Sequence, residues 1–211
     1  MSTPSLARRE RRALCDTALA LGEDAPTLCE GWDAKDLVTH LLVRENRPLG
    51  ALGIAVPRLE GLAEHEMAKV GRADFAALVE KLRHPRLTPY ALPPVDRLLN
   101  TLEYFVHHED LRRAQPGWEA RELDQRDQSR LWSAIKVAGR GLVRPAGVPV
   151  QLRRTDTGAT AVLRRGDDPV VVTGLPSEIV LLLFGRDRVA EVRLDGTAER
   201  VARLRRADLG I

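Results

Sequence analysis

The chain has 211 residues, of which 44% are hydrophobic and 30% are charged. This length predicts one or two domains, and the composition excludes a disordered chain, a collagen-like chain and a coiled-coil rod. The 33 basic residues, nearly all of them Arg, are almost balanced by 30 acidic residues. A net charge of +3 and an aromatic content of 4% do not favour a nucleic-acid-binding protein.

The apolar runs, the N-terminal segment and the cysteines bear on the cellular compartment of the protein. No run of about eighteen apolar residues is present, so we expect no transmembrane helix and no membrane partner. The N-terminal segment is charged and lacks the apolar core of a signal peptide, which predicts a cytoplasmic protein. Cys15 and Cys29 are too few for a disulfide framework and are expected to be reduced there.

Residues 1–143 have the periodicity of helices. Amphipathic helices are predicted at residues 5–20, 33–47, 74–83, 94–114 and 124–143. Asp33 is a candidate N-cap for the second of them. Residues 49–56 either extend that helix or begin a loop, and the proline-rich residues 85–94 form a connector. We therefore predict a helical first domain over residues 1–143.

The period changes after the Arg-Pro-Ala-Gly segment at residues 144–147, which indicates a domain boundary. Strands are predicted at residues 148–152, 160–165, 170–172 and 189–194, with helices at 176–184 and 197–206. Thr197 is the candidate N-cap of the last helix. The predicted fold class is therefore α+β, with a helical bundle followed by a small α+β domain over residues 148–211.

The helix at residues 94–114 has an unusual polar stripe. At about 100° per residue, Glu103, His107 and Asp110 lie along one stripe with apolar positions on both sides of it. Such a stripe faces the interior of a bundle, where carboxylates and imidazoles need partners or a metal ion. His108 points in another direction and is expected to face solvent.

Glu103 and His107 are four residues apart on this helix, so they can share one ion. His40, at the border of the apolar face of the helix at 33–47, is the candidate third ligand. Two imidazoles and one carboxylate leave a coordination position open, as in catalytic metal sites, and they suit zinc, nickel, iron or cobalt. An alternative also stays open: Glu103 and His107 are structural polar groups that form hydrogen bonds or ion pairs with neighbouring side chains.

Three segments together resemble a known family. They are residues 28–33 (LCEGWD), residues 36–42 (DLVTHLL) and, far downstream, residues 103–110 (EYFVHHED). Their order resembles the DinB-like superfamily, and within it the actinobacterial mycothiol-dependent maleylpyruvate isomerase-like proteins. The resemblance implies an N-terminal four-helix bundle that binds a divalent metal, usually zinc, and a small α+β domain after it. It implies the ligands His40, Glu103 and His107.

The resemblance also implies a function. We expect a metal-dependent isomerase or S-transferase that holds mycothiol, a low-molecular-weight thiol, as a thiolate for attack on a small electrophilic substrate. The superfamily also contains metal-binding proteins with no known reaction, so the alternative is a non-catalytic metal-binding bundle that acts as a sensor or binds a partner. The isomerase depends on an arginine of its second domain; Arg186 and Arg188 lie in the nearest segment, and neither aligns securely. A homodimer through an apolar face of the bundle stays open.

Asp110 and the cysteines have competing interpretations. Asp110 either holds His107 through its second ring nitrogen or is an ordinary surface acid that pairs with Arg113 or Arg144. The two cysteines are interpreted as small apolar residues and not as nucleophiles, because neither has a basic neighbour at helical spacing.

Overall fold

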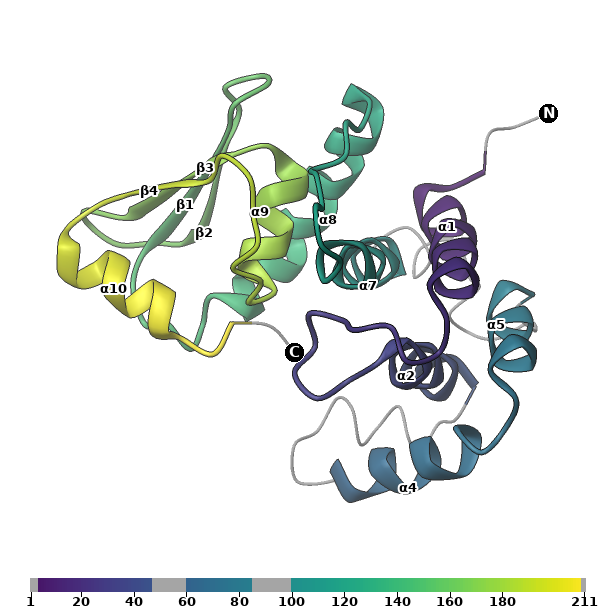
Figure 1. Ribbon diagram of the computed structural model, residues 1–211. Helices are drawn as coiled ribbons and strands as arrows, with labels where there is room; N and C mark the ends of the chain where they lie inside the picture. The colour runs from purple at the N-terminus through teal and green to yellow at the C-terminus, as the bar shows by residue number, and fades with distance from the viewer. Residues whose placement is uncertain (1–3, 47–59, 85–99, 210–211) are drawn as a thin grey trace. The chain divides into compact units, whose positions relative to one another are not determined.

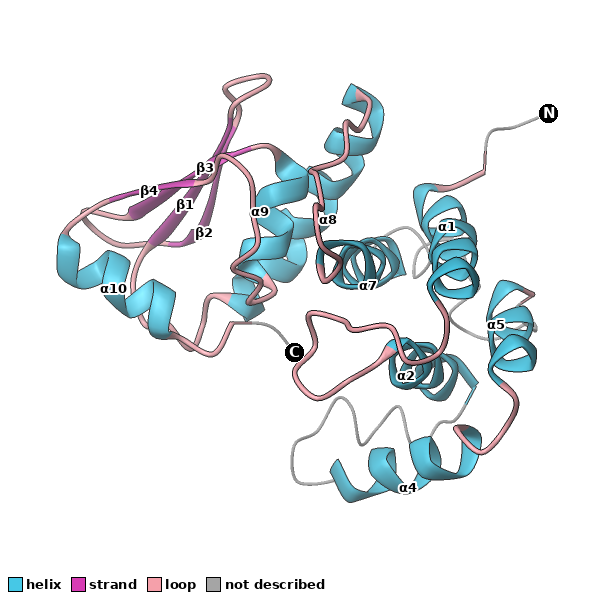
Figure 2. Cartoon of the chain, in the orientation of Figure 1, coloured by secondary structure: helices cyan, strands magenta, loops and turns pink. Residues whose placement is uncertain are grey.

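The computed structural model describes residues 4–46, 60–84 and 100–209. Contacts divide the chain into two compact units, Met1–Glu119 and Ala120–Ile211. Helices make up the described part of the first unit, and the second unit combines helices with a four-stranded sheet (Figures 1 and 2). The predicted α+β class, a helical region followed by a small α+β domain, is confirmed.

The described part of the first unit contains α1 (Leu6–Leu21), α2 (Ala34–Asn46), α4 (Glu60–Val70), α5 (Phe75–Arg83) and α7 (Thr101–Arg113). Helix α4 was not predicted, because its buried apolar residues are only Ala63 and Val70 and its periodicity is correspondingly weak. The expectations for residues 49–56 and 85–94, and for the start of the helix at 94–114, lie outside the described residues.

Short polar side chains begin three of these helices. Ser5, Asp33 and Asp74 each accept a hydrogen bond from the backbone N–H three residues further on, at 3.3, 2.8 and 3.0 Å. Each bond satisfies one of the N–H groups that have no partner in the first turn of a helix. The predicted N-cap at Asp33 is confirmed, and it fixes where α2 begins.

The core of the first unit is apolar and lies among α1, α2, α5 and α7. Its largest buried side chains include Leu14, Leu37, Leu41, Tyr104 and Leu111. Burial of each leucine contributes about 1.5–3 kcal/mol. Cys15 lies in the same core, and burial raises the pKa of its thiol to about 12, which makes it the inert apolar residue that the sequence predicts.

The second unit has a mixed sheet with the strand order β2-β1-β3-β4. Its elements are α8 (Gln125–Leu142), β1 (Val150–Arg154), β2 (Thr160–Arg164), β3 (Val170–Gly174), α9 (Pro176–Leu183), β4 (Arg193–Asp195) and α10 (Ala198–Arg206). Strands β1 and β2 form an antiparallel hairpin, β1 and β3 are parallel, and β4 pairs with β3 antiparallel. Thr197 caps α10 as predicted.

Helix α8 belongs to the second unit, which moves the boundary from the predicted residues 144–147 to residue 120. It packs against α9 and β2. Gln128 of α8 accepts a hydrogen bond from the backbone N–H of Ser177 at 2.9 Å and donates one to its hydroxyl at 3.1 Å. Gly139 lies so close to β2 that an added Cβ would be 2.9 Å from Leu163 Cδ1. The Pro-Gly signal at 145–147 marks a turn within the unit.

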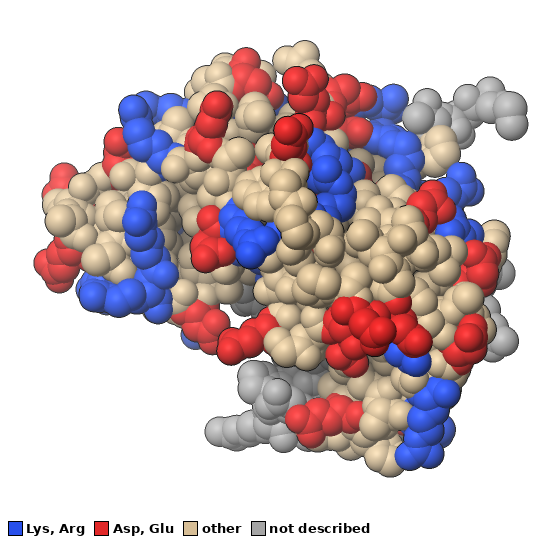
Figure 3. Space-filling view, viewed as in Figure 1, with Lys and Arg blue, Asp and Glu red and all other residues tan. Residues whose placement is uncertain are grey.

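Charges of both signs are interspersed on the visible face of the molecule (Figure 3). This distribution agrees with the near balance of 33 basic and 30 acidic residues. None of the helices in the described ranges is long and apolar enough to cross a membrane.

Candidate metal centre

The three predicted ligands meet inside the first unit. His40 lies on α2, and Glu103 and His107 lie one turn apart on α7. Glu103 Oε1 is 3.5 Å from His40 Nε2 and 3.4 Å from His107 Nε2. One donor atom from each of the three side chains lies within 4.8 Å of the others. The structure thus brings His40 together with a carboxylate and an imidazole that lie more than sixty residues further along the sequence.

The loop before α2 forms one side of the site. Thr27 Oγ1 accepts a hydrogen bond from the Cys29 N–H at 3.1 Å and donates to the Trp32 carbonyl at 2.9 Å. The Leu28 N–H donates to the Asp110 carbonyl near the end of α7 at 3.2 Å. The Trp32 ring then lies against His40, with ring centroids 4.9 Å apart. The loop is therefore anchored to α7, and Trp32 packs against His40.

Glu103 and His40 have the protonation states of metal ligands at neutral pH. Burial alone would raise the pKa of Glu103, but Arg44 and the two imidazoles outweigh it and hold that pKa well below its ordinary value. Burial lowers the pKa of His40, so its imidazole is neutral at pH 7. An ionised carboxylate and a neutral imidazole both have lone pairs available for a cation.

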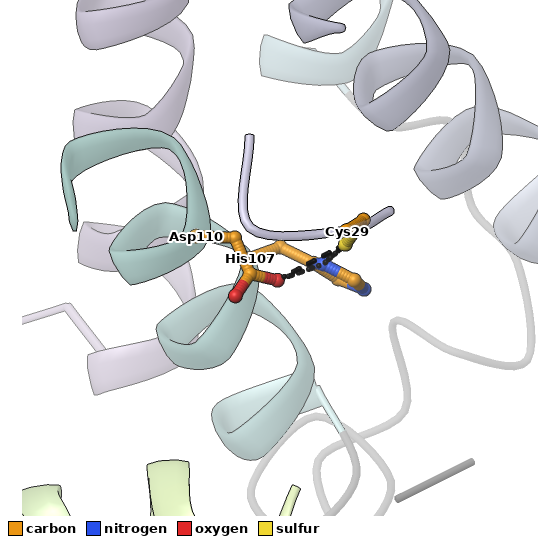
Figure 4. Close-up of side chains that lie close together, drawn as sticks. All are labelled: Cys29, His107 and Asp110. Atoms are coloured by element: carbon orange, nitrogen blue, oxygen red, sulfur yellow. Dashed lines mark hydrogen bonds and ion pairs between the residues drawn. The ribbon is translucent and has the colours of Figure 1, made fainter. Parts of the chain in front are cut away.

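Asp110 fixes the orientation of His107, with Cys29 beside both (Figure 4). The Asp110 carboxylate is fully buried, and its Oδ2 lies 3.0 Å from His107 Nδ1 and 3.3 Å from Cys29 Sγ. When Nδ1–H donates to this carboxylate, Nε2 is the nitrogen that faces Glu103. The geometry supports the first interpretation of Asp110, and not the surface ion pair.

The same interaction sets the charge of His107. Burial disfavours the charged imidazole, but the interactions with Asp110, Cys29 and Glu103 outweigh burial and raise the pKa of His107 well above its ordinary value. In the metal-free chain its ring is therefore protonated at neutral pH. A bound cation would take the place of the proton on His107 Nε2, while the proton on His107 Nδ1 stays hydrogen-bonded to Asp110.

Two expectations from helical spacing need correction. His108 was expected to face solvent, but it is 3% exposed, with Nδ1 2.8 Å from Glu10 Oε2 and Nε2 3.1 Å from Thr17 Oγ1. Helix α1 covers that face of α7. Cys29 was interpreted as a small apolar residue because it has no basic neighbour at helical spacing, but its Sγ lies 3.9 Å from His107 Nδ1, which comes from another segment of the chain.

The sequence analysis missed Arg44. Its Nε lies 3.3 Å from Glu103 Oε1, and its Nη1 donates to Asn100 Oδ1 at 3.1 Å. The signal that could have identified it is its position four residues after His40, on the same face of α2. The other candidate arginines, Arg186 and Arg188, belong to the second unit, and their functional role stays a prediction.

Two of the donor-atom separations are close to those expected around a tetrahedral ion. Ligand distances of about 2.0–2.1 Å in tetrahedral geometry place neighbouring ligand atoms about 3.4 Å apart. The observed separations of 3.5 and 3.4 Å from the Glu103 oxygen to the two Nε2 atoms match this spacing. They are longer than the about 2.7–2.9 Å of a good charge-assisted hydrogen bond. These two separations are therefore compatible with a divalent cation bound by the three side chains.

Two solved structures have a similar fold. One is described as the crystal structure of the mycothiol-dependent maleylpyruvate isomerase; it has a TM-score of 0.58 and 19% identity, with 88% of this chain and 89% of that chain covered. The other is a histidine-to-alanine mutant of the same isomerase, with a TM-score of 0.57 and 19% identity over 86% and 87% of the two chains. No family model and no curated protein matches this chain. The comparison confirms the fold that the resemblance implies.

Replacing Asp110 with Asn is expected to weaken zinc binding about 10- to 100-fold. The amide keeps the size of the side chain but no longer fixes the proton on His107 Nδ1, so Nε2 is not held toward the site. Dissociation constants from competition with a chromophoric chelator measure the effect. Asp16→Asn, at a largely exposed carboxylate, is the matched control, and equal affinities of the two variants would contradict the role of Asp110.

Proposed function

We propose that this chain is a mycothiol-dependent maleylpyruvate isomerase-like protein that works as a thiol-dependent isomerase or S-transferase. In this proposal a divalent metal, with zinc as the first choice, binds His40, Glu103 and His107. The observation that supports it most directly is the spacing of these three donor atoms, each within 4.8 Å of the others. The shared fold with the mycothiol-dependent isomerase structures agrees with it.

Each residue of the site has a distinct task in this proposal. His40 offers a neutral imidazole, Glu103 supplies the negative charge, and Asp110 keeps His107 in the tautomer that presents Nε2. A divalent metal bound with an open position would lower the pKa of a thiol that binds there, so that the thiolate forms near neutral pH. The burial of the three side chains limits the access of water, which strengthens the electrostatic interactions among them.

The reaction class follows from the chemistry of a thiolate. A thiolate can add to an activated carbon–carbon double bond, and rotation about the resulting single bond followed by loss of the same thiolate isomerises the bond. The thiol is regenerated, so the step needs no further reactant. Displacement of a leaving group by the thiolate would instead be S-transfer. A thiol-dependent reaction requires a reducing compartment, which is why we propose the cytoplasm as the location.

The binding of thiol to the site can be measured with cobalt in place of zinc. In cobalt-loaded protein, mycothiol and N-acetylcysteine are expected to produce a saturable cobalt–thiolate absorption band. N-acetylserine, which has a hydroxyl in place of the thiol, is expected to produce none. His107→Ala is expected to abolish the band. Loss of the metal-dependent signal in that variant, with retained circular dichroism, separates loss of the site from loss of the fold.

The outcomes distinguish an enzyme from the non-catalytic alternative. Thiol binding followed by mycothiol-dependent isomerisation of maleylpyruvate supports the isomerase, and mycothiol consumption with another electrophile supports the S-transferase. A site that binds cobalt but gives no thiol band contradicts the thiol-dependent enzyme and favours a metal-binding sensor or partner-binding bundle.

A further inference from the structure

The sheet of the second unit has one face that packs against helices and one that is more open. On β1 and β3 buried side chains alternate with more exposed ones, as expected when one face of a sheet lies in a core. Helices α8 and α9 pack on the buried face. Helix α10 lies at the end of the sheet where β1 and β3 begin, with Gly196 beside Val170 and Arg203 beside Gly147. The opposite end of the open face is therefore away from α10.

Three residues form a row across the open face at that opposite end. Arg153 of β1 pairs in register with Thr173 of β3, and Thr173 pairs in register with Arg193 of β4. The three strands are neighbours in the sheet (Figure 2). Paired residues on neighbouring strands share a face and lie about 4.8 Å apart. Thr173 is thus flanked by an arginine on each side.

The middle residue of this row has a hydroxyl group that no protein atom uses. Among the residues that the structure describes, Thr173 Oγ1 is shielded from solvent and has no hydrogen-bond partner. Buried polar groups in proteins are nearly always hydrogen-bonded, so an unsatisfied one needs an explanation. A hydroxyl can donate one hydrogen bond, and the two neighbouring cations would attract a negatively charged acceptor to it.

Neither arginine is held in a strong ion pair. Arg153 is exposed, and within the described ranges it forms no ion pair. Arg193 Nε donates to Asp195 Oδ2 at 2.9 Å, but the arginine side chain is 72% exposed. Exposed ion pairs of this kind contribute little to stability. An anion with more charge than a carboxylate can therefore displace Asp195 from Arg193.

We propose that Arg153, Thr173 and Arg193 bind the phosphate group of a phosphate monoester on the open face of the sheet. Such a group carries close to two negative charges near neutral pH and has three acceptor oxygens, which match two guanidinium groups and one hydroxyl. Val162 and Val171 lie in the next row of the same face, where they would contact the organic part of the ester. This site lies in the second unit, and it goes beyond the proposed metal-dependent function without depending on it.

Titration of isotope-labelled chain with phenyl phosphate at constant ionic strength, followed by two-dimensional NMR, tests the site. Saturable shifts are expected for the amides of the three residues, with a Kd of about 1 mM or tighter. Arg153→Met and Arg193→Met are each expected to raise the Kd about 10-fold or more, the effect of a hydrogen bond to a charged group. Arg140→Met makes the same chemical change at an exposed position on α8, and its Kd is expected to equal that of wild type.

Two further variants separate binding from a structural role. Thr173→Val keeps the shape of the side chain but lacks the hydroxyl. Without ligand its Tm is expected to be equal to or higher than that of wild type, because an unsatisfied buried group is gone, whereas its Kd for phenyl phosphate is expected to rise about 10-fold. Asp195→Asn removes the competing carboxylate and is expected to tighten binding about 2- to 5-fold. A lower Tm and an unchanged Kd in Thr173→Val would overturn the role of the hydroxyl.

The remaining outcomes also decide the proposal. Shifts that do not saturate, or equal effects of Arg153→Met and Arg140→Met, overturn the site. Shifts confined to the helical unit overturn it as well, because the phosphate would then bind at the candidate metal centre. Phosphatidylcholine vesicles that contain phosphatidic acid present the same chemical group on a lipid. Binding to these vesicles without binding of phenyl phosphate would overturn a soluble ester as the ligand and would identify a lipid headgroup instead.

Discussion

Glu103→Gln is expected to lower the affinity for zinc by more than about 100-fold. Residues that only orient a metal ligand contribute about 10- to 100-fold, whereas in the proposed site Glu103 is itself a ligand and supplies the negative charge between the two imidazoles. The amide has nearly the same volume but no charge. It also leaves Arg44 without its anionic partner at 3.3 Å. Competition with a chromophoric chelator gives the dissociation constant.

Glu64→Gln is the matched control for this variant, because it makes the same chemical change at an exposed position on α4. Its zinc affinity is expected to equal that of wild type. Zinc binding within about threefold of wild type in Glu103→Gln, with unchanged circular dichroism, would contradict the assignment of Glu103 as a ligand. Even a residue that only orients a ligand changes metal affinity by about 10-fold or more.

Arg113→Met is expected to reduce the free energy of unfolding of the helical unit by about 3–5 kcal/mol, the usual cost of removing one partner of a buried ion pair. Arg113 and Glu109 are each 1% exposed, and Arg113 Nε donates to Glu109 Oε2 at 2.6 Å. The guanidinium also lies over the Trp118 ring, 4.7 Å from its centroid. Methionine fills the space of the aliphatic part but leaves the Glu109 carboxylate buried beside a weaker partner. Urea unfolding followed by far-ultraviolet circular dichroism measures the change.

Arg112→Met provides the comparison within the same cluster. Arg112 also contacts Glu109, at 3.0 Å, but its side chain is 27% exposed, so solvent screens the interaction and we expect a loss of less than about 1 kcal/mol. Glu109→Gln combined with Arg113→Met should recover part of the stability, because the uncompensated charge is gone. Equal losses in Arg112→Met and Arg113→Met would contradict the distinction between the buried and the exposed pair.

The sequence predicts those features that depend on the periodicity of one element. Helices α1, α2, α5 and α8 and the four strands follow from apolar spacing and turn residues, and the caps at Asp33 and Thr197 follow from residue type. The placement of Glu103, His107 and Asp110 on one face of α7 is a property of a single helix. That is why this part of the candidate site could be identified before any contact was known.

Features that depend on packing between elements could not be read from periodicity. His108 is buried because α1 covers a face that the helical wheel of α7 assigns to solvent, with Glu10 as its partner. Cys29 meets His107 because the loop before α2 folds back onto the end of α7. The unit boundary at residue 120 depends on α8 packing against the sheet, which overrides the Pro-Gly signal near residue 145.

The most direct test of the account is the zinc content of protein purified without chelator or nickel resin. Elemental analysis measures this content for wild type, His40→Ala and His107→Ala. We expect about one zinc per wild-type chain and none in either variant, with the helical circular dichroism of all three retained. His40 is decisive because it comes from α2, while the other two proposed ligands come from α7. A wild-type chain that binds no zinc, even after zinc is added, would contradict the account and would leave Glu103 and the two histidines as buried structural polar groups.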